Sequence, residues 1–113
     1  MSKTNNTLNY DGKILSVGKR QYADGQTAIT LTCENGEHYA TVSVNLSAYG
    51  LTLPANQIAV DHNLMHDEEL LVEFIKGFCE IPKDGKFNAV TYGSFNCESL
   101  ILTLKDVDSI PLR

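Results

Sequence analysis

The feature that most limits how this chain can fold is an Asn35-Gly36 pair between two alternating runs, residues 27–33 and 39–46. Asn-Gly favours a two-residue hairpin turn because both central residues of such a turn need positive φ. A turn of this length brings the apolar side chains of both runs to one face, as a half-buried antiparallel sheet requires. We therefore predict a hairpin with these cross-strand pairs: Cys33 with His38, Thr32 with Tyr39, Leu31 with Ala40 and Thr30 with Thr41.

The strongest helical pattern runs from about His66 to Lys76. Its apolar residues, spaced for one helix face, are Leu70, Leu71, Phe74 and Ile75. Acidic residues near the start and Lys76 near the end suit the helix dipole. We expect Asn63 or His66 to cap the start and Gly77 to end the helix in a left-handed conformation.

Shorter alternating segments predict further strands around residues 14–17, 58–60, 87–92 and 97–104. Together these patterns predict an α+β fold, with an antiparallel sheet of four to six strands and one main helix packed on it. With 113 residues, the chain is expected to form a single domain over 1–113. The polar ends, residues 1–9 and 106–113, are expected to be loose.

The charge is uneven along the chain. The net charge is −5, and all of it comes from residues 57–113, which carry ten acids and five bases. An acidic chain is unsuited to binding nucleic-acid phosphates, so we expect no direct nucleic-acid partner. There is no apolar run long enough for a bilayer and no secretory signal, so the expected location is the cytoplasm, with no membrane partner.

Two clusters are candidates for function. The first is acidic: Asp67, Glu68, Glu69 and Glu73 could contact a basic protein partner or could simply form the solvated face of a helix. The second contains Asp61, His62 and His66, since two histidines four residues apart on a helix can bind a divalent ion and a carboxylate can add oxygen. The second cluster could equally be a polar loop before the helix, and it lacks the HExxH pattern.

Enzymatic activity is not expected. Cys33 and His38 could lie opposite each other as a thiol and base, but small buried thiols are the simpler interpretation of Cys33, Cys79 and Cys97. The chain has no glycine-rich phosphate loop and no GxSxG motif. We therefore predict no catalytic residues and no cofactor.

Several motifs occur in a familiar order: Tyr22-Ala23-Asp24-Gly25 before Ala28-Ile29, residues 39–46 (YATVSVNL), residues 53–56 (LPAN), Asp61-His62-Asn63 and Phe74. Over residues 20–76 the chain resembles a small uncharacterised family carried by conjugative elements and phages of gut bacteria. The resemblance implies a mobile-element setting in a bacterial host cell. It assigns no activity and no catalytic residue. The polar positions that match are Asn45, Asn56, Asp61 and Asn63.

The leading hypothesis is a non-enzymatic accessory protein of a mobile element that binds a protein partner. Its sharpest form is an inhibitor of a host nucleic-acid-targeting defence, of the anti-CRISPR or anti-restriction type, that acts through the acidic surface. This step rests on analogy with small acidic proteins of mobile elements. The alternatives are a small-ligand or metal-binding module and a homo-oligomeric structural subunit, for example a homodimer.

Overall fold

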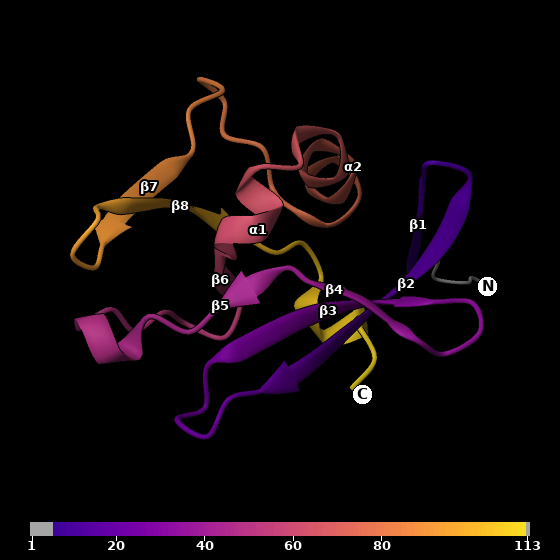
Figure 1. The fold of residues 1–113 in the computed structure, drawn as a ribbon, viewed down its shortest axis with the longest axis horizontal. Coiled ribbons are helices and arrows are strands. Elements are labelled where there is room, and N and C mark those ends of the chain that lie inside the picture. Colours follow the sequence, from indigo (N-terminus) through magenta and orange to yellow (C-terminus); the bar gives the residue numbers. More distant parts are fainter. Residues whose placement is uncertain (1–5, 113) are drawn as a thin grey trace.

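The computed structural model describes residues 6–112, which form two four-stranded antiparallel sheets and two α-helices (Figure 1). The first sheet has the order β1-β2-β3-β4, with bounds Thr7–Tyr10, Lys13–Gln21, Thr27–Cys33 and His38–Thr41. The second has the order β5-β6-β8-β7, with bounds Ser43–Val44, Gln57–Val60, Cys97–Thr103 and Asn88–Tyr92. The helices are α1, His62–Met65, and α2, Glu68–Phe78. The α+β class is confirmed, with the strands divided between two sheets.

The first hairpin begins earlier than the sequence pattern suggested. β1 pairs with β2 through a two-residue turn in which Asp11 has φ 52° and Gly12 has φ 75°. Positive φ at both positions is the geometry that Asp-Gly favours in a tight hairpin. Residues 7–9 therefore lie in a strand, and the expectation of a loose start is wrong for them. Residues 1–5 lie outside the described residues.

The β3–β4 hairpin has the predicted pairs Leu31 with Ala40 and Thr30 with Thr41, but His38 lies opposite Thr32. Gly36, with φ 90°, adds a residue to the turn, and the Cys33 amide donates to the Glu37 carbonyl. One extra residue near Tyr39 then restores the predicted register. The pairs Cys33–His38 and Thr32–Tyr39 are wrong because two bulges replace the simple two-residue turn.

The run expected to form one strand over residues 39–46 is divided between the sheets. The Val42 amide donates to the Ile29 carbonyl of β3, and the Val42 carbonyl accepts from the Asp61 amide after β6. Ser43 then pairs with Val60 and joins the second sheet. The Ile29 amide donates to the Ser43 hydroxyl at 2.9 Å, so a side chain satisfies this buried backbone group where the strand changes sheet.

The helical region consists of two helices with different caps from those expected. Asp61 caps α1 by accepting from the Asn63 amide, and Asp67 caps α2 by accepting from the Leu70 amide. Asn63 and His66 are therefore not the N-caps. Gly77 lies inside α2, which ends at Phe78 with Cys79 extended. The predicted left-handed stop is wrong because the apolar face continues to Phe78, which is buried.

One core joins both sheets, both helices and the C-terminal segment. α2 lies between the β1–β2 hairpin and the β7–β8 hairpin (Figure 1). Its Phe74 is fully buried. Ile110 is 2% exposed, and the Lys19 amide and ammonium donate to the carbonyls of Pro111 and Val107. Residues 106–112 are thus packed against β2, and the expectation of a loose end is wrong for them. Residue 113 lies outside the described residues.

In the part of the chain that the structure describes, no helix combines the length and apolar character that crossing a membrane requires.

Candidate functional site

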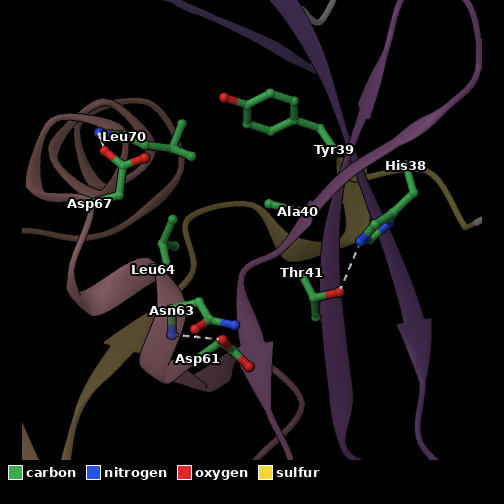
Figure 2. Close-up of a pocket in the computed structure, with 9 residues that line it drawn as sticks. All are labelled: His38, Tyr39, Ala40, Thr41, Asp61, Asn63, Leu64, Asp67 and Leu70. Carbon is green, nitrogen blue, oxygen red and sulfur yellow. Dashed lines mark hydrogen bonds between the residues drawn. The ribbon is translucent and has the colours of Figure 1, made fainter.

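The cleft in Figure 2 lies between β4 and the two helices and has a volume of about 520 Å³. β4 contributes His38, Tyr39, Ala40 and Thr41, and the helical side contributes Asp61, Asn63, Leu64, Asp67 and Leu70. β4 is the last strand of its sheet, so the side of the strand away from β3 carries no neighbouring strand. The register shift beside Tyr39 places a bulge in this strand at the cleft.

The two carboxylates in this cleft are held in place by helix capping. Asp61 Oδ1 accepts from the Asn63 amide at 2.9 Å. Asp67 Oδ1 accepts from the Leu70 amide at 3.3 Å and from the Tyr10 hydroxyl at 2.9 Å. Each of these carboxylates uses one oxygen in these contacts and is a fixed negative charge at the cleft wall. The arrangement favours a cationic group as the cleft's occupant.

A second hollow, of about 440 Å³, lies between the β1–β2 turn and α2. Its charged lining residues are Asp11, Glu68, Glu69 and Glu73. A third hollow, of about 520 Å³, shares Tyr10, Glu68 and Glu69 with the second and Asp67 with the cleft. We call the carboxylates that line these three hollows the acidic band, which consists of Asp11, Asp61, Asp67, Glu68, Glu69 and Glu73. No lysine or arginine within residues 6–112 lines any of the three.

Sequence reasoning missed the contribution of the first hairpin to this surface. Asn9, Tyr10 and Asp11 belong to a segment that was expected to be loose or to precede the first strand, yet they line the second hollow. The signal was present in Asp11-Gly12, a dipeptide typical of tight hairpin turns, with Leu8 and Tyr10 before it and Ile14 after it.

A hydrogen bond from the Tyr10 hydroxyl to Asp67 joins the β1–β2 hairpin to α2, and it also changes the pKa of Tyr10. The hydrogen bond to the Asp67 carboxylate raises the pKa of Tyr10 to about 12, with smaller contributions from burial and from the charges of Asp67 and Glu69. Tyr10 is therefore a neutral hydrogen-bond donor at physiological pH. Asp67 has two structural contacts in addition to its place in the acidic band.

His62 and His66 are close together. Their Nε2 atoms are 3.2 Å apart, and the rings are nearly perpendicular, with centroids 4.6 Å apart. Asp61 is engaged as the cap of α1. Among the described residues, no group of three or more His, Cys, Asp or Glu side chains is arranged to hold a metal ion. The two histidines therefore form a pair without Asp61 as a third ligand.

The other candidate groups have structural partners. His38 lies opposite Thr32, and its Nε2 is 3.4 Å from the Thr41 hydroxyl, so the register does not pair it with Cys33. All three cysteines are free, and burial raises the pKa of the Cys79 thiol to about 12. A buried thiol of this kind is a poor nucleophile. Among the matched polar positions, Asn45 accepts from the Ser47 amide and Asp61 caps α1.

Comparison of the chain with protein-family models, with curated proteins and with solved structures gives no match.

Proposed function

We propose that this protein is a non-enzymatic binding module whose acidic band contacts a basic surface on a partner protein. The observation that carries the proposal is the gathering of carboxylates from two distant segments, the β1–β2 turn and the start of α2, around connected hollows. Fixed charges of one sign speed the encounter with an oppositely charged partner and favour it over wrong partners.

The band also contains groups that suit contact with protein. Val72 is 45% exposed and lines the second hollow among the carboxylates, beside half-buried Tyr10. Protein interfaces commonly combine an aromatic and aliphatic centre with a charged rim. Val72 would contact an apolar residue of the partner, and the surrounding carboxylates would contact basic residues beside it.

The partner class that we favour is a nucleic-acid-targeting defence protein of a bacterial host. A groove that binds nucleic acid is rich in lysine and arginine, so a band of carboxylates can occupy it in place of phosphates. The resemblance to proteins of conjugative elements and phages implies a setting in which such defences are encountered. Under this proposal the protein acts by blocking the groove.

The test combines affinity capture from a lysate of the natural host with charge reversal. Asp67 is left unchanged because it caps α2, and the test variant is Glu68→Lys, Glu69→Lys and Glu73→Lys. The matched control reverses three exposed acids outside the band, Glu34→Lys, Glu80→Lys and Glu98→Lys, which gives the same net charge.

We expect the wild type and the control to retain one stoichiometric partner and the test variant to bind it roughly a hundredfold more weakly, at about 1 kcal/mol for each reversed charge. Binding should weaken as salt concentration rises, and nucleic acid should compete for the same partner. Equal loss in the test variant and the control would refute the role of the band. A partner that binds nucleic acid and this protein together would refute groove blocking.

A further inference from the structure

The histidine pair at the start of the helical region lies beside the acidic band, since His66 lines the third hollow together with Asp67. His62 is the first residue of α1, and His66 is its C-cap, so the two are one helical turn apart. Both side chains are exposed, and their Nε2 atoms lie 3.2 Å apart. From these contacts we propose that His62 and His66 chelate a divalent transition-metal ion through their Nε2 atoms.

The separation of the two nitrogens fits a shared metal. Two nitrogens on one tetrahedral zinc, with Zn–N bonds of about 2.0–2.1 Å, lie roughly 3.3–3.4 Å apart, and at a 90° bond angle they lie roughly 2.9 Å apart. The observed 3.2 Å lies between these values. The spacing of the two Nε2 atoms therefore matches that of two ligands on one metal ion.

The backbone fixes the pair in this position. α1 is capped by Asp61, the Met65 amide donates to the Asp61 carbonyl and the His66 amide donates to the Asn63 carbonyl, so the two histidines lie in overlapping hydrogen-bonded turns. The ring planes are nearly perpendicular, at 85°, and the two Nε2 atoms are in contact at 3.2 Å. Two ligands held on one turn bind a metal much more tightly than either does alone, since the second bond forms within the molecule.

The ligand type indicates the class of metal. Imidazole nitrogen suits nickel, copper and zinc, whereas magnesium and calcium prefer oxygen. Since no third described His, Cys, Asp or Glu joins the pair, the remaining coordination positions are open to water or to groups from another chain. The site therefore binds a borderline ion with two protein ligands, and magnesium is a suitable negative control.

The experiment is a calorimetric titration of chelator-treated protein with Ni²⁺, in the presence of excess Mg²⁺. The variants are His62→Gln and His66→Gln, and the matched control is His38→Gln, the third histidine of the chain, which lies on β4. Because thiols also bind such ions, all titrations are repeated with Cys33→Ser and Cys97→Ser, the two half-buried cysteines. Circular dichroism checks that each variant is folded.

We expect one Ni²⁺ per chain in the wild type and in the His38→Gln control, and binding weakened roughly a hundredfold in either chelating-pair variant. Half an ion per chain with a doubled mass by light scattering would also support the pair, because two copies would then supply two imidazoles each. The proposal is overturned if neither His62→Gln nor His66→Gln weakens binding, if the cysteine variants abolish it, or if Ni²⁺ does not bind.

Discussion

At the scale of single residues, a polar cluster beside the β2–β3 turn shows how neutral and charged side chains stabilise each other. The side-chain amide of Gln26, 9% exposed, donates to Asp24 at 2.8 Å and to Asn45 at 2.9 Å, and its Oε1 accepts from the Leu53 amide. The cluster connects the turn to the loop after β5. Asn45 also accepts a hydrogen bond from the Ser47 amide at 2.9 Å.

The Asp24 carboxylate should make stability depend on acidity. Hydrogen bonds from Gln26 lower the pKa of Asp24 from 3.8 to about 2. A lowered pKa means that the stabilising contribution is present above about pH 4 and is lost as the pH falls toward 2. We expect the difference in unfolding free energy between wild type and Asp24→Asn to be constant from pH 7 to 5 and to shrink below pH 4 in urea titrations. Equal differences at pH 5 and pH 2.5 would contradict this.

Asp67 should matter for stability apart from any partner. Replacement by alanine removes the cap of α2 and the contact with Tyr10, so we expect a loss of about 1–2 kcal/mol in unfolding free energy. Tyr10→Phe removes only the contact with Asp67 and should cost less. Chemical denaturation of both variants provides the measurement. A larger cost for Tyr10→Phe than for Asp67→Ala would show that capping is not the main role.

At the scale of elements, the sequence predicted which segments form strands better than it predicted where the strands divide. Residues 39–46 alternate without interruption, and alternation depends only on which face each side chain occupies. At the change of sheet the alternation of burial is broken, because Val42 and Ser43 are both buried and Val44 is half-buried. The alternating sequence gives no sign of this break. The bulges near Gly36 and Tyr39 cancel each other, which explains why Leu31–Ala40 was predicted correctly and Cys33–His38 was not.

Ser43 provides a test of this change of sheet. Its hydroxyl accepts from the buried Ile29 amide, and Ser43 is 2% exposed. Ser43→Ala leaves that N–H group without a partner, so we expect a loss of about 1–3 kcal/mol in unfolding free energy. Thermal or urea unfolding measures it. Ser94→Ala, at an exposed turn, is the control and should be nearly neutral. A neutral Ser43→Ala would mean that another acceptor replaces the hydroxyl.

At the scale of the whole molecule, local sequence patterns predicted the α+β class. They did not predict that residues 7–9 form a strand or that residues 106–112 pack against β2. Ile110 lies in a polar stretch with Pro111 and no periodic pattern, so nothing local marks it as core. The candidate site also depends on packing between distant segments, which local patterns do not show. The acids of α2 were visible in the sequence, but their proximity to Asp11 depends on how the first hairpin packs against the helix.

The packing of the C-terminal segment can be tested with two apolar residues that differ in burial. Ile110 is 2% exposed and Leu112 is 74% exposed. Ile110→Ala should lower the unfolding free energy by about 2–5 kcal/mol, because a core cavity remains. Leu112→Ala should change it by less than about 0.5 kcal/mol. Denaturation curves for the two variants decide the point, and similar small effects would show that this segment contributes little to the core.

The backbone of Val42 belongs to both sheets, since its amide bonds to β3 and its carbonyl bonds to the residue after β6. Separating the sheets at this point breaks either the bond from the Val42 amide to Ile29 or the bond from the Asp61 amide to Val42. The two sheets should therefore unfold as one cooperative unit. Amide hydrogen exchange would then report the same opening free energy for the central strands β3 and β8, with no partly unfolded state that keeps a single sheet.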